Sequence, residues 1–335
     1  MQEQKPSPED QMMQWITSKW ITKPICVAAE IGIADHLLAG PLSVDVLAGE
    51  TETHAPTLYR LLRALAAVGI FTETQDRIFG LTPLAECLLT DRMRPLIRMF
   101  LSDWHDLAWG ALDYTVRTGK PGFDYAFGQP AFEWMETNPD ARATLDQGQG
   151  CKATSLSQAV MEVQDFSRVE SICDVGGGQG AFLVSLLKKH SHLKGIVADL
   201  PGAISAAEKE ILNADLKDRC QAIAYDFLEE APPVCDAYFL VNVLHDWDED
   251  ICRRILKSIS SSMKADSRLW VVEFLLESGP GFSVAKLLDL EVLIMGGGHE
   301  RSLSSYTALL NSVNLSVARV TPTSSGSALL ECMVQ

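Results

Sequence analysis

Residues 174–180 read DVGGGQG, and this glycine-rich stretch decides the fold of the chain. The apolar segment 171–173 precedes it, and AFLVSLLKKH (181–190), with apolar residues at helical spacing, follows it. A strand that turns through glycines into a helix lets a ligand approach the backbone and meet the amides of the helix N-terminus. The stretch therefore predicts the first strand and helix of an α/β domain, with a ligand site between them.

The chain that follows this stretch alternates between apolar segments typical of buried strands and segments with helical spacing. Such alternation predicts a doubly wound, mostly parallel sheet. Two apolar segments close together near the C-terminus predict an antiparallel hairpin at the sheet edge. The expected strands are 171–176, 195–200, 220–226, 236–244 and 269–277, and the hairpin strands are 315–320 and 328–334.

The glycine loop itself narrows the kind of ligand. Dinucleotides, phosphates and S-adenosylmethionine all bind at such loops. Asp174, just before the glycines, would repel a pyrophosphate and attract a cationic amino-acid group. Gly176, Gly178 and Gly180 follow the spacing GxGxG, which departs from the dinucleotide pattern GxGxxG. These details favour S-adenosylmethionine.

Acidic residues also end the next two expected strands. Asp199 ends the second strand, where a carboxylate accepts hydrogen bonds from both hydroxyls of a ribose. Asp226 and Phe227 end the third, a position suited to contact a base by hydrogen bonding and apolar packing. Ligands of open α/β sheets bind at the carboxyl ends of the strands, so we expect these residues to lie together.

The N-terminal half is predicted to be helical. Residues 1–100 form one domain, in which the pattern of 41–94 is that of a winged helix-turn-helix. That segment has five arginines, no lysine and seven acidic residues, so we expect it to contact protein rather than DNA. Residues 101–165 form a helical linker, in which KPGFDYAFGQPAF (120–132) is expected to be a loop whose aromatic rings line a substrate pocket or join the core. Residues 166–335 form the ligand-binding domain.

Composition excludes several classes of partner. The formal net charge of −16 disfavours binding to nucleic acid or to an anionic membrane. The sequence has neither an apolar run long enough to span a bilayer nor the basic and apolar layout of a signal peptide, so a cytoplasmic location is expected. The eight cysteines occur singly, which predicts reduced thiols rather than disulfides or a zinc site.

Taken together, the motifs resemble the S-adenosylmethionine-dependent O-methyltransferases that include the caffeic acid and hydroxyindole methyltransferases. The resemblance covers nearly the whole chain and implies a Rossmann-like catalytic half, a homodimer built through the N-terminal domain, and S-adenosylmethionine as cofactor, with S-adenosylhomocysteine as product. It also implies a small aromatic acceptor from secondary metabolism. The matching stretches are DVGGGQG (174–180), DLP (199–201), DF (226–227), LHDWDED (244–250), VVEFLLE (271–277) and GGGHERS (296–302).

The resemblance also assigns roles to residues. His245, at the end of the expected strand 236–244, is the general base, and Glu273 and Glu300 orient its imidazole. A histidine near its ordinary pKa of about 6.5 is available as a base at neutral pH. The acids from Asp248 onward are expected to begin the next helix, whose N-terminus is positive. The assigned cofactor contacts are Gly176, Asp199, Asp226 and Phe227, to which the loop residues Asp174 and Gly178 are added.

Three other functions stay open. His299 stands where the family often has a non-histidine, and with His245 it resembles a metal site of the α-keto acid C-methyltransferases. A solvated loop histidine explains the same residue, so no metal is expected. The segment 145–155 has small and polar residues where the family has an aromatic and a methionine, which leaves the acceptor open. The second alternative is a regulator whose winged helix binds DNA and whose effector is the cofactor. The third is a protein that binds S-adenosylmethionine but catalyses a reaction other than methyl transfer.

Overall fold

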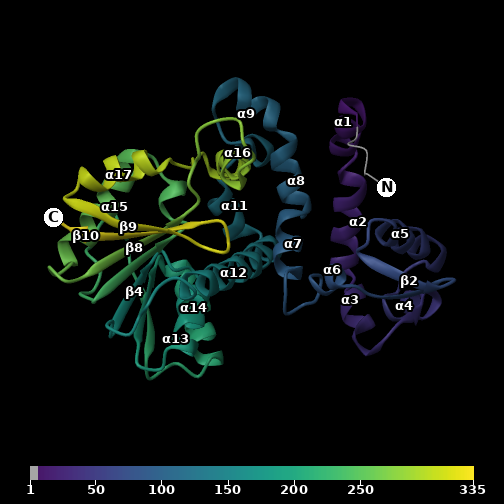
Figure 1. Cartoon of the computed structure of the whole chain (residues 1–335), viewed down its shortest axis with the longest axis horizontal. Helices are drawn as coiled ribbons and strands as arrows, with labels where there is room; N and C mark the ends of the chain where they lie inside the picture. The colour runs from purple at the N-terminus through teal and green to yellow at the C-terminus, as the bar shows by residue number, and fades with distance from the viewer. Residues whose placement is uncertain (1–6) are drawn as a thin grey trace. The chain divides into compact units, whose positions relative to one another are not determined.

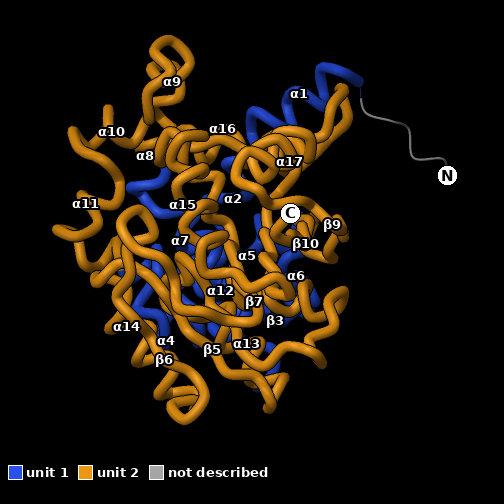
Figure 2. The backbone as a smooth tube through the Cα atoms, turned by 90° about the vertical axis from the view of Figure 1, so that its left-hand side faces the viewer, with its two compact units in different colours: residues 1–106, 143–151 blue, residues 107–142, 152–335 orange. Residues whose placement is uncertain are grey.

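The computed structural model describes residues 7–335 and divides them into two compact units (Figure 2). Unit 1 comprises the described residues up to 106 together with 143–151, and unit 2 comprises 107–142 and 152–335. The expected linker 101–165 is therefore shared between the units. The long helix α12 (Pro139–Met161) contributes residues to both.

Unit 1 is helical with one small sheet, in the order β1-β3-β2. Two successive helices, α4 and α5, precede the antiparallel pair β2–β3, which is the order of elements expected for 41–94. Its elements are α1 (Pro8–Ile16), α2 (Lys19–Glu30), α3 (Ile33–His36), η1 (Leu37–Ala39), β1 (Leu42–Ser43), α4 (Val44–Glu50), α5 (Ala55–Ala67), β2 (Phe71–Gln75), β3 (Ile78–Leu81), α6 (Pro83–Glu86) and α7 (Arg94–Phe100), and α8 (Asp103–Gly110) crosses its boundary.

The core of unit 1 follows from the spacing of apolar residues on α5. Leu58, Leu62 and Leu65 recur at helical intervals and are at most 4% exposed. They pack in one cluster with Phe71 and Phe79 of the small sheet. Burying each such side chain contributes about 1.5–3 kcal/mol, so this stripe holds the helix against the sheet.

Unit 2 is an α/β domain. Its sheet has seven strands in the order β6-β5-β4-β7-β8-β10-β9, parallel except for the C-terminal hairpin (Figure 1). The strands are β4 (Ser171–Val175), β5 (Lys194–Asp199), β6 (Cys220–Ala224), β7 (Ala237–Val241), β8 (Arg268–Glu273), β9 (Leu315–Pro322) and β10 (Ala328–Val334). The helices are α9 (Leu112–Thr118), α10 (Gly122–Phe127), α11 (Ala131–Thr137), α13 (Ala181–Lys189), α14 (Pro201–Asn213), η2 (Leu244–Asp246), α15 (Glu249–Ser262), α16 (Val284–Gly296) and α17 (Leu303–Asn311).

Both faces of this sheet are buried. Helices α15 and α17 cover one face, and α13, α14 and the end of α12 cover the other (Figure 1). Side chains of one strand alternate between the two layers, so Tyr238 and Leu240 enter one core and Phe239 enters the other. The doubly wound, mostly parallel sheet and its antiparallel hairpin are confirmed. Among the described residues, no helix has both the length and the apolar character that a membrane span needs.

Three expected segments differ clearly from the structure. Strand β8 ends at Glu273 rather than at 277. Strand β7 ends at Val241 rather than at 244, because Asn242 has a φ of 51° and turns the chain out of the strand. The expected loop 120–132 instead forms the short helices α10 and α11 around Gly128. Phe123 of that segment is fully buried and stacks near Phe127, with ring centroids 4.5 Å apart, so these rings pack on each other.

Candidate active site

The glycine loop between β4 and α13 places Asp174 in a buried position. The side chain is 1% exposed, and its Oδ2 has no hydrogen-bond partner among the described residues. A Cβ on Gly177 would lie 2.8 Å from that oxygen, so only glycine leaves room for the carboxyl there. Burial raises the pKa of Asp174 to about 7, and the nearby charge of Asp199 adds to the effect. A buried carboxyl without a donor fits a ligand that carries an ammonium or another N–H group.

Asp199, at the end of β5, is tied to this loop. Its Oδ2 accepts a hydrogen bond from the Gly178 amide at 2.6 Å, and its Oδ1 accepts one from the Leu200 amide at 2.7 Å. Gly178 has a φ of 56°, with no heavy atom within 4 Å of the Cβ it lacks, so the loop backbone is open there. The two amides fix the carboxylate, and each oxygen keeps one lone pair for a further donor such as a ribose hydroxyl.

The segments that follow strands β6 and β7 lie at the same edge of the sheet as the glycine loop. Asp226 follows β6, and its Oδ1 accepts a hydrogen bond from the Leu228 amide at 2.9 Å. The Phe227 ring meets the Trp247 ring edge-on, with centroids 5.8 Å apart. Because β6, β5, β4 and β7 are neighbours in the sheet, their carboxyl ends bring the glycine loop, Asp199 and Asp226 to the same edge as the segment that carries His245.

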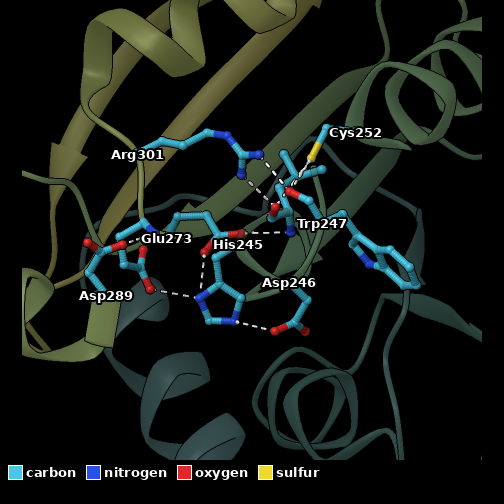
Figure 3. A network of polar contacts seen from close by, with 9 residues as sticks. His245, Asp246, Trp247, Cys252, Glu273, Asp289 and Arg301 are labelled. Atoms are coloured by element: carbon cyan, nitrogen blue, oxygen red, sulfur yellow. Dashed lines mark hydrogen bonds and ion pairs between the residues drawn. The ribbon is translucent and has the colours of Figure 1, made fainter. Parts of the chain in front are cut away.

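His245 lies in the one-turn helix η2 and is 5% exposed. Its Nδ1 lies 2.8 Å from Oε1 of Glu300 and 3.6 Å from Oε2 of Glu273, and its Nε2 lies 3.6 Å from Oδ1 of Asp246 (Figure 3). When the imidazole is neutral, the short contact makes Nδ1–H the donor to Glu300 and leaves the lone pair of Nε2 as an acceptor. Glu273 also accepts a hydrogen bond from the Leu244 amide at 2.9 Å, which ties β8 to this turn.

The charges around His245 change its acid–base behaviour. Burial by itself lowers the pKa of His245, but the carboxylates of Glu273, Asp246 and Glu300 outweigh it and raise that pKa to about 9. The expectation of an ordinary histidine pKa is therefore wrong, because three carboxylates surround the imidazole. Burial in turn raises the pKa of Glu273 to about 7. An imidazole held in this way becomes a stronger base once it loses its proton.

Arg301, which was not assigned a role from the sequence, stabilises this turn through hydrogen bonds to its backbone. It is 3% exposed, and its two terminal nitrogens donate to the carbonyl oxygens of Leu244 at 2.7 Å and Trp247 at 2.6 Å (Figure 3). The amide of Glu300 donates to Oδ1 of Asp289 at 2.8 Å. In the sequence, the motif GGGHERS contains this arginine, but only burial distinguishes it from a surface residue.

The structure changes the interpretation of two residues, His299 and Lys152. The side chain of His299 is exposed, and its tie to His245 runs through its amide, which donates to the His245 carbonyl at 2.8 Å. Among residues 7–335, the one group of three possible metal ligands is His245, Glu273 and Glu300, with ligand atoms within 4.8 Å of one another, and it leaves out His299. Burial lowers the pKa of Lys152, in the segment that had been interpreted only as small and polar, and the charges of Asp246 and Glu273 oppose that effect.

Two family profiles match most of the chain. A family profile described as an O-methyltransferase domain matches residues 109–315, and one described as an O-methyltransferase dimerisation domain matches residues 13–91. The chain belongs to the O-methyltransferase family. The motif-based resemblance is thereby confirmed, and the chain is an S-adenosylmethionine-dependent methyltransferase.

Two curated relatives are similar over almost their full length. Phenazine O-methyltransferase PhzM of Lysobacter antibioticus is 35% identical over 96% of this chain and 94% of its own. Mitomycin biosynthesis 6-O-methyltransferase of Streptomyces lavendulae is 35% identical over 95% of this chain and 92% of its own. The crystal structure of LaPhzM superposes with a TM-score of 0.91 at 34% identity, covering 98% of this chain and 100% of that one.

Proposed function

We propose that the protein transfers a methyl group from S-adenosylmethionine to a hydroxyl oxygen of a small aromatic metabolite, with His245 as general base. The observation that carries the proposal is the 2.8 Å contact between Nδ1 of His245 and Glu300, which leaves Nε2 as the proton acceptor once the imidazole is neutral. The relatives named for phenazine and mitomycin support an aromatic acceptor and a role in secondary metabolism.

The residues of the glycine edge fit the cofactor. The unpartnered Oδ2 of Asp174 suits the ammonium of its amino-acid part, and the carboxylate of Asp199 suits its ribose hydroxyls. The backbone at Gly176 and Gly178 can lie against it, and Asp226 with Phe227 suits the base. When bound, S-adenosylmethionine supplies a methyl group on a positively charged sulfur, and S-adenosylhomocysteine leaves with the bonding electron pair.

In this mechanism the protein aligns the acceptor and removes its proton. Nε2 of His245 takes the hydroxyl proton as the new oxygen–carbon bond forms. Glu300 accepts the hydrogen bond from Nδ1 and, with Glu273, stabilises the imidazolium. Because a nearby positive charge lowers the pKa of a histidine, a bound cationic cofactor makes the unprotonated base more available at neutral pH.

The experiment that tests this role replaces His245 by Asn and follows two quantities. Calorimetric binding of S-adenosylhomocysteine should be retained, because the residues assigned to the cofactor are unchanged. Methyl transfer from labelled cofactor to aromatic hydroxy compounds, followed by mass spectrometry, should fall by about 10²- to 10⁴-fold. Full activity of this variant contradicts the base role.

The alternative of a metal-assisted C-methyltransferase acting on an α-keto acid has less support. Its proposed pair, His245 with His299, has one buried and one exposed side chain. A chelator separates the two functions, because it would abolish metal-assisted C-methylation and leave base-catalysed O-methylation unchanged.

A homodimer through unit 1 is part of the same proposal. Helices α1 and α2 expose a set of large apolar side chains, which soluble monomers rarely gather on one short segment. Such a face fits a second copy of the chain, in line with the dimerisation domain matched at residues 13–91. The exposed residues are Met12, Met13, Trp15, Ile16, Trp20 and Ile21.

A further inference from the structure

The loop of residues 297–301 follows α16 and contacts the turn that carries His245. The amide of His299 donates to the carbonyl oxygen of His245 at 2.8 Å, and Oε1 of Glu300 lies 2.8 Å from Nδ1 of the same histidine. Glu300 is 2% exposed, and close packing leaves its carboxylate little freedom to reach the imidazole from another direction. The contact between Glu300 and Nδ1 therefore depends on where this loop lies.

At Gly298 the loop backbone lies directly against the backbone of His245. A Cβ at this position would overlap the carbonyl oxygen of His245 and lie 3.0 Å from Cα of Asp246, so a side chain is excluded there. The φ of Gly298 lies outside the left-handed region, unlike that of Gly297 at 79°. The backbone conformation at 298 therefore suits any residue, and it is the close approach to His245 that requires glycine.

Asp289 of α16 binds the same loop at Glu300. Its Oδ1 accepts a hydrogen bond from the Glu300 amide at 2.8 Å (Figure 3). At the next residue, the carbonyl oxygen of Arg301 accepts a hydrogen bond from the Leu276 amide at 3.0 Å. The backbone of Glu300 is thus held between α16 and the segment that follows β8. A backbone fixed in this way determines where the Glu300 side chain begins and which way it points.

Helix α16 is anchored on other helices of unit 2 and not on the glycine loop. Nε1 of Trp109, on α8, donates to Oε2 of Glu291 at 2.7 Å. On α10, a Cβ added to Gly122 would lie 3.3 Å from Cγ2 of Ile294, so the two helices are in close contact. The residues assigned to the cofactor instead follow or end β4, β5 and β6. We therefore expect changes at the α16 loop to affect the base and to spare the cofactor edge.

We propose that Gly298 and Asp289 are positioning residues, through which α16 places Glu300 against Nδ1 of His245 and so sets the base for proton transfer. The inference rests on the proposed function, because it treats His245 as the base. Gly298 lets the loop close on the His245 carbonyl, and Asp289 holds the Glu300 backbone there. Such support matters because a displacement of about 1 Å at a catalytic group can lower a rate about 100-fold.

The test observes the contact between His245 and Glu300 separately from turnover. The full-length protein is labelled with ¹⁵N-histidine, saturated with S-adenosylhomocysteine and studied by NMR. It should give a low-field imidazole N–H resonance, because the proton on Nδ1 of His245 is buried and hydrogen-bonded to a carboxylate. His245→Asn assigns this resonance by its absence. The value of kcat with aromatic hydroxy compounds and the dissociation constant for S-adenosylhomocysteine are measured on the same variants.

A pair of glycine substitutions tests the approach of the loop. Gly298→Ala forces the loop away from the His245 carbonyl, so the low-field resonance should disappear or move upfield and kcat should fall by about 10- to 100-fold. The affinity for S-adenosylhomocysteine should not change. Gly296→Ala, two positions earlier, is the matched control, because no heavy atom among residues 7–335 lies within 4 Å of the Cβ it adds. It should keep the resonance and kcat.

Two substitutions of Asp289 test the second support. Asp289→Ala removes the acceptor of the Glu300 amide, so it should also weaken the resonance and lower kcat. Asp289→Asn keeps an oxygen that can accept from that amide, and it should restore most of both. If Gly298→Ala does not fold by circular dichroism, the comparison of these two variants decides the inference.

The outcomes separate this inference from the proposed function. The inference is overturned if the wild type gives no low-field resonance, if the resonance is unchanged in Gly298→Ala or Asp289→Ala, or if Gly296→Ala has the same effect as Gly298→Ala. A resonance that is lost in Gly298→Ala while kcat stays at the wild-type value upholds the placement of Glu300 by the loop. That result would contradict the base role of His245 instead.

Discussion

Arg301 holds the turn that carries His245 at both ends, because its guanidinium donates to the carbonyl oxygens of Leu244 and Trp247. The arginine follows Glu300, the residue that contacts Nδ1 of the same histidine. Two adjacent residues of one loop thus fix the imidazole. Glu300 contacts the His245 ring directly, and Arg301 binds the backbone on either side of His245. The position of the base depends on this loop as much as on the strand before it.

The first prediction concerns this backbone support. Arg301→Lys keeps the charge but cannot reach both carbonyl oxygens, so we expect kcat to fall on the order of 100-fold. The dissociation constant for S-adenosylhomocysteine should not change. Arg253→Lys, whose side chain pairs with acids on the surface of α15, is the control. A variant that loses thermal stability but keeps wild-type kcat would show that Arg301 has a structural role only.

The second prediction is a pH dependence. The pKa of His245 is raised to about 9, and a base must be unprotonated, so kcat/KM should increase with pH and level off near that value. Below it, the rate constant should fall about tenfold per pH unit. With cofactor bound, its positive charge should move the corresponding limb of kcat to lower pH. If kcat/KM instead levelled off near the ordinary histidine pKa of about 6.5, the carboxylates would not dominate the pKa of His245.

A third prediction compares the two glutamates. Glu300→Gln removes the charge at 2.8 Å from Nδ1, so the pKa of His245 should fall and the pH limb should move to lower pH. Because the imidazolium then lacks its direct partner, kcat should fall by about 10- to 100-fold. Glu273→Gln removes a charge at 3.6 Å and should cost less kcat, since the amide oxygen can still accept from the Leu244 amide. Equal losses in kcat would show that distance does not rank the two residues.

Cofactor affinity provides a fourth prediction. Asp199→Asn would turn an NH₂ group toward one of two backbone amide donors, those of Gly178 and Leu200. We expect S-adenosylhomocysteine to bind about 10- to 100-fold more weakly, measured by calorimetry. Asp174→Asn should also weaken binding, because it removes the charge opposite the cofactor's ammonium. Asp266→Asn, at an exposed turn, is the control and should bind normally.

The fifth prediction concerns assembly. Trp15 and Trp20 are 63% and 69% exposed within one chain, and a second copy would bury them. Sedimentation velocity should give a dimer for the wild type and a monomer for Trp15→Glu with Trp20→Glu, because a charge in an apolar interface is strongly unfavourable. Leu212→Glu, at an exposed apolar position of α14, should remain dimeric. A monomeric wild type would exclude the interface.

Much of the catalytic unit was predictable because its signals are local. Apolar runs of strand length predicted β4, β5 and β6 within a few residues, and the acids at or just after their carboxyl ends lie at the same sheet edge. Asp248 was expected to begin a helix, and its side chain does accept a hydrogen bond from the Ile251 amide at the start of α15. Such features depend on neighbours within a few positions, so composition and spacing carry them.

The chemistry of the site was decided by contacts between distant segments. His245 and Glu300 are 55 positions apart, and their pairing was implied by a family resemblance rather than by spacing. The raised pKa of His245 and the buried guanidinium of Arg301 depend on which side chains packing removes from water. Sequence therefore determined the sheet, the glycine loop and the residues at its edge. Tertiary structure alone decided their charge states, because burial and proximity across the fold set electrostatic energies.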